Sequence, residues 1–437
     1  MGLLTFKGGI HPPHAKESTE HLPIVDFLGP KVVEIPLRQH IGAPCEATVK
    51  KGDEVKVGQL IGAAGGFVSA NVHSSVSGTV LDVKKQNTAY GFDTCVIIEN
   101  DEQYVLHETV VPKPDYKTLS GKEIVDIIKE AGIVGMGGAG FPTHVKLSPP
   151  PEKPIDTIVL NGAECEPYLT CDHRLMLEEP ASIIKGLQIL MHALNVKDGV
   201  IGIESNKPDA IETMTKAASG TGIRVVGLKT KYPQGAEKQL IYACTGRAIP
   251  SGGLPMDIGV VVNNVATVAT IGNLFETGLP LVQRICTVTG KGIKSPKNIR
   301  FRVGTPLKQL IEFCDGYNGT PGKILLGGPM MGVAQFSDEL PAMKNTSGVL
   351  VFSEEEAKLP EATACIKCGK CVSICPINLE PIQISAYALM HEYDKAAKFN
   401  ALDCIECGSC SFICPAKRPL LQSIRVAKRE ILARRKK

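Results

Sequence analysis

Eight cysteines near the C-terminus form two copies of one motif, C-x2-C-x2-C-x3-C-P. The copies are Cys365, Cys368, Cys371 and Cys375 before Pro376, and Cys404, Cys407, Cys410 and Cys414 before Pro415. In this spacing three thiolates surround one 4Fe-4S cubane, and the fourth, held beside the proline, binds the other cluster. We therefore expect one cluster on Cys365, Cys368, Cys371 and Cys414, and a second on Cys404, Cys407, Cys410 and Cys375. The motif predicts a chain that carries electrons.

Two other uses of paired cysteines fit the motif less well. Structural zinc sites also use C-x2-C pairs, but they need four ligands per site and no proline after the fourth. A disulfide framework is typical of small secreted domains, whereas this chain has 437 residues and we expect no secretory leader. The remaining seven of the 15 cysteines lack metal-ligand spacing, so we interpret them as reduced, buried residues of a cytosolic protein.

The second chemical feature is a glycine-rich loop that ends in Phe141 and Pro142. Its glycines are Gly135, Gly137, Gly138 and Gly140. Glycine lets backbone N–H groups approach a phosphate or a flat ring closely. Proline suits the first turn of a helix, and Lys146, one turn further on, could reach a phosphate. The loop alone indicates either a phosphate-binding site or a structural turn.

Three further segments favour the binding site. They are Asn161-Gly-Ala-Glu164-Cys-Glu166-Pro167, Tyr232-Pro-Gln-Gly235-Ala-Glu237-Lys238 and Asn263-Asn264-Val-Ala-Thr-Val. With the loop, they resemble motifs that occur in the same order in the NADH-binding flavoprotein subunits of respiratory complex I, hydrogenases and formate dehydrogenases. Those motifs read R-G-x-G-G-A-G-F-P, N-A-D-E-S-E-P, Y-x-x-G-E-E and N-N-V-E-T.

The resemblance implies a role for each matched residue. The four glycines would cradle FMN, Lys146 would bind its phosphate, and its ribityl chain and ring edges would contact Asn161, Glu164, Asn263 and Asn264. Tyr232 and Gly235 would line the flavin edge, and NADH would face Phe141 and the candidate catalytic residues Glu166 and Glu237. The chain departs from the family at four positions, where Val134 and Met136 replace arginines, Ala163 an aspartate and Ala236 the first glutamate of a pair.

The elements that must position these residues begin with a β-rich front end. Short apolar runs between glycine turns predict strands over 32–36, 46–49, 55–60, 78–83 and 95–99. The segments Val49–Ile61 and Ser75–Val80 resemble the two halves of a biotinyl or lipoyl carrier domain, which is a barrel-sandwich fold. A carrier needs a lysine between these halves, and 57–83 contains none. We therefore interpret this module as a docking or scaffolding domain.

From about Ser120 strands and helices alternate, which predicts a mostly parallel sheet covered by helices. The strands are expected over 157–160, 200–204, 223–229 and 258–262, and the helices over 121–131, 181–194, 208–218, 236–244 and 265–277. A compact β-rich module follows, with strands within 285–303, a helix over 307–313 and a Gly-Gly-Pro turn at 327–329. Helices over 381–399 and 420–437 predict a helical ferredoxin-like domain around the cysteines.

This order of parts resembles the RnfC family, whose members are subunits of Rnf complexes, the ion-translocating ferredoxin:NAD oxidoreductases. The fold class is therefore expected to be multidomain α/β plus β. Its parts are an N-terminal segment and barrel-sandwich hybrid over 1–115, an FMN- and NADH-binding α/β domain over 116–283, a β-grasp-like, soluble-ligand-binding module over 284–355, and a helical domain with two 4Fe-4S clusters and a basic tail over 356–437.

The resemblance implies a peripheral electron-transfer protein on the cytoplasmic side of a membrane. It would exchange hydride with NAD(H) at FMN and single electrons through two 4Fe-4S clusters, and its partners would couple this transfer to ion translocation. The implied partners are the other Rnf subunits, especially a ferredoxin-like relay subunit that passes electrons from ferredoxin. Membrane association would run through these partners.

Three alternative functions are considered beside this one. A soluble NADH-oxidising diaphorase subunit would carry different front modules, and a non-catalytic iron–sulfur relay would lack a working nucleotide site. One component of the sodium-pumping quinone reductase shares the domain plan but lacks the cysteine repeat. The sequence also argues against two further classes of protein. No run of 18 apolar residues predicts a membrane span, and nothing indicates nucleic-acid binding. The net charge of +3 divides into +8 over 417–437 and −5 elsewhere, so this tail could attract anionic lipid or an acidic protein, or be a solvated helix end.

Overall fold

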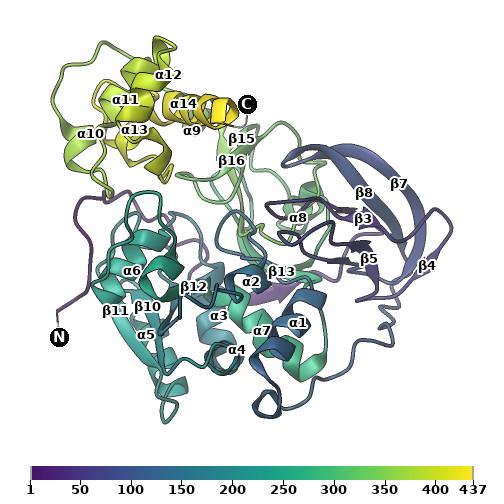
Figure 1. Cartoon of the computed structure of the whole chain (residues 1–437). Helices are drawn as coiled ribbons and strands as arrows, with labels where there is room; N and C mark the ends of the chain where they lie inside the picture. The colour runs from purple at the N-terminus through teal and green to yellow at the C-terminus, as the bar shows by residue number, and fades with distance from the viewer. Residues whose placement is uncertain (1, 436–437) are drawn as a thin grey trace.

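A computed structural model describes residues 2–435 and shows four parts that follow one another along the chain (Figure 1). The first three parts are a barrel sandwich, an α/β domain and a six-stranded sheet, and they form the lower body of the molecule in this view. The fourth part, the helical cysteine domain, lies above the α/β domain. Among these residues no helix has the length and apolarity that a bilayer-crossing segment requires.

The front part is a barrel sandwich of two small antiparallel sheets, ordered β2-β8-β7-β4 and β3-β5-β6. The fully buried side chains of Val33, Ile61 and Ile98 help to fill the core between them. The run predicted at 55–60 is divided between two strands, because the chain turns at Gly58, where φ is +85°. The strands are β2 (Val32–Pro36), β3 (Glu46–Ala47), β4 (Glu54–Val55), β5 (Leu60–Ala63), β6 (Val72–His73), β7 (Gly78–Thr88) and β8 (Gly91–Asn100).

The α/β domain is built on a four-stranded sheet in which every neighbouring pair is parallel, with the order β11-β10-β9-β12. This confirms the predicted parallel sheet. The chain builds outward from β9 through β10 to β11 and then returns to the other side of β9, so the strand order reverses between β9 and β12. The strands are β9 (Thr157–Gly162), β10 (Asp198–Glu204), β11 (Arg224–Leu228) and β12 (Val260–Asn264).

Helices cover both faces of this sheet, because successive residues of a buried strand point to opposite sides. Ile158 and Leu160 of β9 pack into a core with α1, α3, α4, α5 and α7, whereas Val159 packs against α6. Helix α1 begins at Ser120, which forms a capping box with Glu123. The sequence did not predict α3. The helices are α1 (Gly121–Glu130), α2 (Thr143–Lys146), α3 (Cys171–Glu178), α4 (Pro180–Ala193), α5 (Pro208–Ala217), α6 (Glu237–Thr245) and α7 (Val265–Thr277), with 3-10 turns η1 (Tyr116–Thr118) and η2 (Pro255–Ile258).

The third part is a mixed six-stranded sheet with the order β1-β14-β13-β17-β15-β16 and the predicted helix over 307–313. Its edge strand β1 comes from the N-terminal segment and pairs in parallel with β14. The elements are β1 (Ile24–Asp26), β13 (Gln283–Thr289), β14 (Lys297–Arg302), α8 (Leu307–Phe313), β15 (Pro321–Leu326), β16 (Val333–Gln335) and β17 (Gly348–Ser353).

The cysteine domain is helical, as predicted, but the single helix expected over 381–399 is wrong. Two helices occupy this stretch, and the chain turns between them at His391, where φ is +58°. The turn lets both helices pack on the terminal helix, since Ile384 and Ala396 are buried in one core with Ile424. The helices are α9 (Glu354–Ala357), α10 (Lys370–Ser373), α11 (Pro381–Leu389), α12 (Tyr393–Lys398), η3 (Ala401–Asp403), α13 (Ser409–Ile413) and α14 (Leu420–Arg435). The last two positions of the predicted terminal helix lie outside the described residues.

The first residues of the chain lie against the α/β and cysteine domains rather than the barrel. Leu4 bridges to Leu228 at the end of β11, and Ile10 bridges to Tyr232. Between them, the Gly9 N–H donates to the carbonyl of Ile374 in the cysteine domain, at 2.8 Å. This segment therefore fastens the α/β domain to the cysteine domain.

Candidate functional site

The main candidate site lies where the strand order of the parallel sheet reverses. Such a point leaves a crevice at the carboxyl ends of the strands, where open α/β sheets bind their ligands. Asn161 at the end of β9 pairs in register with Asn264 at the end of β12. One pocket at this edge is lined by all of the predicted flavin and NADH residues: Gly135, Gly137, Gly138, Gly140, Phe141, Lys146, Asn161, Glu164, Glu166, Tyr232, Gly235, Glu237, Asn263 and Asn264.

The glycine loop closes on itself at the pocket wall. Val134 and Pro142 form an antiparallel bridge, and the Gly135 N–H donates to the carbonyl of Phe141 at 2.8 Å. A Cβ at Gly137 would lie 3.0 Å from the amide nitrogen of Asn264, whereas a Cβ at Gly138 would meet no atom within 4 Å. The loop therefore approaches Asn264 closely on one side and leaves open space on the other, which suits a cradle for a flat ring or a phosphate.

The lysine predicted to hold the flavin phosphate lies beside the glutamate predicted to face NADH. Lys146, at the end of α2, donates from Nζ to Oε1 of Glu237 and to the carbonyl of Val262, both at 3.1 Å. Glu237 is the first residue of α6. The side chains of Lys146 and Glu237 are 30% and 40% exposed, so both charges can still reach a ligand in the pocket.

The three asparagines of the pocket differ in whether their side chains already have hydrogen-bond partners. Asn161 donates to the carbonyl of Gly235 at 2.7 Å, and Asn264 caps α7 by accepting from Ala266 N at 2.8 Å. Asn263 is only 4% exposed, and within residues 2–435 its amide nitrogen has no hydrogen-bond partner. A buried donor without a partner is costly, so Asn263 is the amide best placed to donate to a ligand.

Glu164 and Glu166 are not solvated side chains but fix neighbouring elements. The carboxylate of Glu164 accepts from the N–H groups of Asp172 and His173, at 2.7 and 3.2 Å, and so caps the start of α3. That of Glu166 accepts from Met330 N and Met331 N, at 3.0 and 2.8 Å, in the turn between β15 and β16. Burial raises the pKa of Glu166 to about 7.

Sequence reasoning missed two buried lysines beneath this acidic segment. Lys16 donates to the carbonyls of Glu164 and Glu166, both at 3.0 Å, and to that of Leu169. Lys207 donates to the carbonyl of Ala163 at 2.8 Å, and burial lowers its pKa. Lys16 lies 148 residues before Glu164, so no local spacing could have identified it.

Asp172 lines the pocket and is a third residue that the sequence did not indicate. Its Oδ2 accepts from the amide of Asn264 at 2.6 Å, while its Oδ1 has no partner within the described chain. Burial and the neighbouring carboxylate of Glu164 raise its pKa to about 6. The pocket thus holds a buried acid whose ionised form is disfavoured by burial and by Glu164.

One predicted cysteine set comes together at a single cavity, and three members of the other set lie close to one another. One small cavity is lined by the whole set Cys375, Cys404, Cys407 and Cys410. In the other set, the thiols of Cys414 and Cys365 lie close enough to Cys371 to raise its pKa. Burial makes the largest contribution to that rise. The fourth member, Cys368, is exposed together with Cys365.

The two motifs fold alike around their first cysteines. In one the N–H of Lys367 points at the sulfur of Cys365, and in the other that of Glu406 points at Cys404, both at 3.4 Å. Lys367 and Glu406 share a left-handed backbone, with φ of +57° and +56°. Burial raises the pKa of Cys404 to about 11, so cluster binding must displace its proton. Thiols grouped in this way, with N–H donors aimed at sulfur, fit two equivalent 4Fe-4S clusters.

Only one cysteine set adjoins the pocket within the described chain. Ile405 lines both the pocket and the cavity of the Cys404 set. Tyr232 is 1% exposed and donates its hydroxyl to the carbonyl of Cys407 at 2.7 Å. In the Cys365 set, Cys365 and Cys368 are exposed instead.

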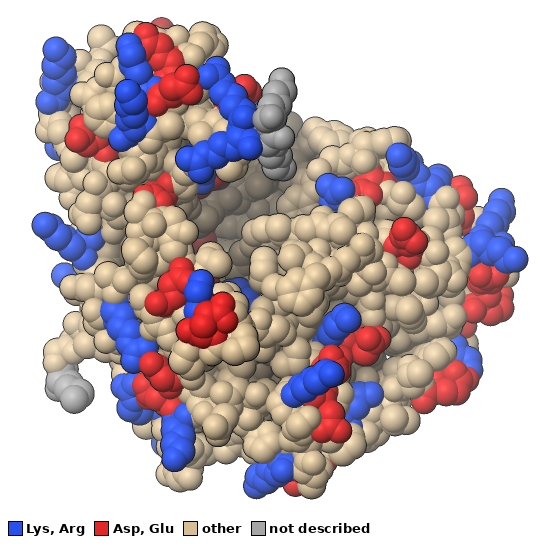
Figure 2. Space-filling view, in the orientation of Figure 1, with Lys and Arg blue, Asp and Glu red and all other residues tan. Residues whose placement is uncertain are grey.

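Figure 2 shows a recess between the cysteine domain and the body below it, and basic side chains gather on that domain near α14.

Family models match each part of the chain. The Nuo51 FMN-binding domain matches 128–273, and the RnfC barrel sandwich hybrid domain matches 4–103. The SLBB domain matches 285–334, and the 4Fe-4S dicluster domain matches 357–426. The domains and their sites define an electron-transfer flavoprotein with FMN and two 4Fe-4S clusters, as predicted.

The chain belongs to the RnfC family of ion-translocating ferredoxin:NAD+ oxidoreductase complexes, which confirms the predicted family. It is 52% identical over 435 residues to the corresponding subunit of the Na+-translocating complex of Acetobacterium woodii, covering 99% of this chain and 98% of that one. It is 50% identical to the corresponding subunit of the proton-translocating complex of Clostridium ljungdahlii, covering 98% and 94%.

A solved structure shares the fold. The match is to a chain of the NAD+-reducing [NiFe]-hydrogenase in the air-oxidized state, with a TM-score of 0.50 and 17% identity, over 74% of this chain and 62% of that one. Together with the four family models, this match confirms the multidomain fold class, whereas the roles of individual site residues stay predictions.

Proposed function

We propose that this chain is the component of a ferredoxin:NAD+ oxidoreductase complex that exchanges hydride with NAD(H) and passes single electrons through its two clusters. When bound, FMN supplies the chemistry that converts between a hydride and single electrons. The observation that carries the proposal is that Ile405 lines both the pocket and the Cys404 cavity, while Tyr232 of the pocket donates to the carbonyl of Cys407.

The residues of the pocket divide into those that bind the flavin and those that shape its surroundings. The glycine loop would cradle the ring and phosphate, Lys146 would neutralise the phosphate, and Asn263 would donate its amide, which has no partner among the described residues. Asn161 and Glu164 act through Gly235 and α3, since their polar atoms hold these parts of the wall in place. Phe141 and Glu237 lie at the pocket surface, where they would contact NAD(H).

Glu166 has a second role beside the one that its motif implies. Its carboxylate anchors the turn at Met330 and Met331, and Met331 lines the pocket. Nicotinamide contact by Glu166 would therefore involve this turn as well. The β-grasp-like module thus contributes directly to the wall of the nucleotide site.

The position of the cysteine sets gives an order to the electron path. The Cys404 set adjoins the pocket, and the Cys365 set has two exposed thiols. We assign the first set to exchange with the flavin side and the second to exchange with a partner. Around the second set Ile366 is 67% exposed and Lys367 is exposed, which provides a docking surface for a ferredoxin-like relay subunit.

The membrane location follows from the partners. The chain has no spanning helix among its described residues, so its attachment would run through the other subunits of the complex on the cytoplasmic side. The ion translocated and the direction of electron flow would be properties of those subunits.

Cofactor content and reduction by NADH test the proposal. Anaerobically purified chain should hold about eight irons and one flavin, and NADH should bleach first the flavin and then the clusters. A variant Ile405→Ala keeps every ligand but thins the wall between pocket and cavity, and it should retain cofactors while changing the rate of cluster reduction. Clusters without flavin would instead identify an iron–sulfur relay, and zinc in the thiolate sites would refute the proposal.

A further inference from the structure

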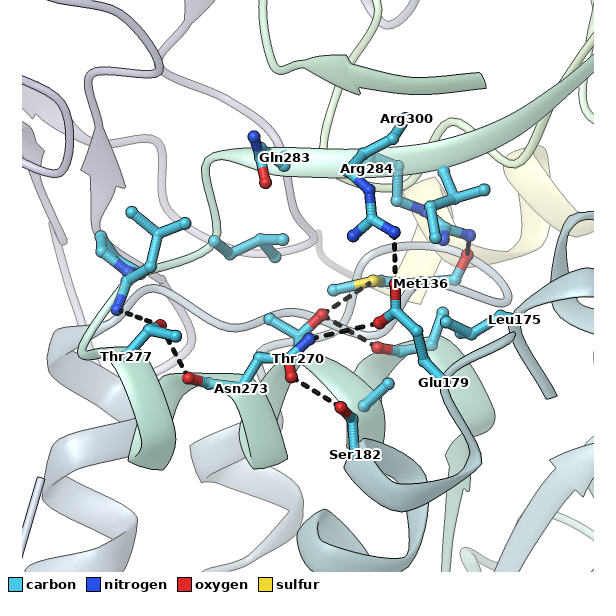
Figure 3. Close-up of a pocket in the computed structure, with 16 residues that line it drawn as sticks. Met136, Leu175, Glu179, Ser182, Thr270, Asn273, Thr277, Gln283, Arg284 and Arg300 are labelled. Carbon is cyan, nitrogen blue, oxygen red and sulfur yellow. Dashed lines mark hydrogen bonds and ion pairs between the residues drawn. The ribbon is translucent and has the colours of Figure 1, made fainter. Parts of the chain in front are cut away.

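A second cavity, of about 390 Å³, lies behind the glycine loop and shares no lining residue with the flavin pocket. Its walls come from α7, the start of α4 and the strands β13 and β14. Figure 3 shows Met136 of the glycine loop at its centre, between Arg284 of β13 and Thr270 of α7. The cavity therefore touches the back of the loop that faces the flavin pocket.

Arg284 is a buried cation with little compensation. It is 3% exposed, and its one hydrogen bond within residues 2–435 runs from Nη2 to the carbonyl of Met136 at 3.5 Å. Its Nε is buried without a partner. Figure 3 shows the guanidinium extending from the strand toward Met136, into the cavity. Burying a guanidinium without a partner is costly. An anion bound in the cavity is the simplest way to offset the charge of this group.

The other charges at the cavity already balance one another. Arg300 forms ion pairs with Glu179 and with Asp26, the latter at 3.0 Å. Asp172 lines the flavin pocket rather than this cavity, and although its carboxyl experiences the charge of Arg284, its hydrogen bond comes from the neutral amide of Asn264. Arg284 itself has no ion pair within the described chain. The cavity thus offers a guanidinium that no carboxylate of the described residues contacts directly.

The remaining walls supply groups that would orient a small ligand. The hydroxyl of Ser182 donates to Asn273 at 2.7 Å, and the hydroxyl of Thr270 donates to the carbonyl of Ala266 at 2.9 Å. Both hydroxyl oxygens can still accept a hydrogen bond. Leu175 and Leu281 add apolar surface. This combination of one cation, a few polar groups and apolar walls is typical of small-molecule pockets.

We propose that this cavity binds a small oxyanion, a carboxylate or a phosphate, on the guanidinium of Arg284. The guanidinium can hold such a group through two N–H donors. Because the same side chain also donates to Met136, the bound anion and the glycine loop share one anchor. Anion binding here is independent of the proposed function, since it requires no flavin chemistry.

Anion binding to the complete chain tests this site. Equilibrium dialysis is performed on protein loaded with FMN and clusters, so that the flavin phosphate position is filled, with labelled inorganic phosphate in one arm and labelled acetate in the other. One saturable equivalent of either anion is expected, and the arm that binds identifies the ligand as phosphate-like or carboxylate-like. Arg284→Gln should weaken binding at least tenfold, whereas Arg224→Gln, an exposed arginine paired with Asp198, should leave it unchanged.

A second variant covers the case in which Arg284→Gln does not fold. Thr270→Met keeps the guanidinium and fills the cavity, and it should also weaken binding at least tenfold. Saturable binding of neither anion by the unmodified chain would overturn the proposal. So would folded Arg284→Gln or Thr270→Met protein that binds as tightly as the unmodified chain. Flavin content is measured in parallel, so a failure of this site is distinguishable from a failure of the flavin site.

Discussion

Replacement of Lys16 by methionine tests whether the buried lysine holds the acidic segment of the flavin pocket. Methionine keeps much of the length and apolar stem of the side chain but removes the ammonium. In the native chain this ammonium donates to the carbonyls of Glu164, Glu166 and Leu169 and lies 4.0 Å from the carboxylate of Glu164. The three carbonyls would lose this donor at once, and the carboxylate of Glu164 would lose its neighbouring cation while keeping the N–H groups of Asp172 and His173.

The expected magnitude follows from burial. Lys16 and Glu164 have side chains that are each 4% exposed, so water cannot readily replace the lost contacts. Removing one partner of a buried charge pair costs about 3–5 kcal/mol. For a domain the size of the α/β domain, that loss of stability corresponds to a fall in the melting midpoint of roughly 6 to 20 °C. FMN affinity should also fall at least tenfold, because Glu164 and Glu166 line the pocket.

Far-UV circular dichroism under anaerobic conditions measures the melting midpoint, since the chain contains no tryptophan for fluorescence. FMN retention is measured by flavin fluorescence after gel filtration. Lys7→Met, an exposed lysine of the same segment, is the matched control and should leave both quantities unchanged. Lys16→Arg should recover part of the loss. A Lys16→Met protein that melts within about 2 °C of the unmodified chain and keeps its FMN would refute the reasoning.

Three further predictions concern the cofactor ligands and one buried acid. Cys375→Ala should lower the iron content by about half and remove the electron paramagnetic resonance signal of the Cys404 cluster; loss confined to the other cluster would show the ligand sets to be wrong. Lys146→Gln should weaken FMN binding by about 1.5–3 kcal/mol, roughly 10- to 150-fold, because a charged hydrogen bond to phosphate is lost, and an unchanged dissociation constant would contradict this assignment. Glu166 has a pKa of about 7 when folded, raised by burial from an ordinary value of 4.5, so the folded chain keeps a proton that the unfolded chain releases. Stability should therefore fall as pH rises through this window, and between pH 5.5 and 8 the unmodified chain should lose about 2 kcal/mol relative to Glu166→Gln. Parallel pH curves for the two proteins would rule this out.

Local pattern predicted much of the architecture. The helices over 265–277 and 307–313 have the predicted bounds, and the alternation of strands and helices correctly indicated a parallel sheet. These elements follow from apolar periodicity and turn residues, which act over a few neighbouring positions. Local pattern did not reveal α3, whose start is capped by Glu164 from a loop that precedes it.

The break at His391 shows where periodicity fails. The sequence over 381–399 has a helical pattern on both sides of this residue, so one helix was expected. Two helices form because both Ile384 and Ala396 then reach the terminal helix, and one straight helix could not place both there. Contact with a distant helix, rather than local propensity, decided the outcome.

The sequence by itself determined which chemistry the chain can perform, because thiolate spacing and a glycine loop depend on residues close along the backbone. Only the tertiary structure decided how the charges are buried: Lys16 beneath Glu164, Glu166 beneath the turn at Met330, and Arg284 behind the glycine loop, where its Nε has no partner among the described residues. The free energy of a charge depends on its distance from partners and from water, and folding sets both distances for residues that are far apart in sequence.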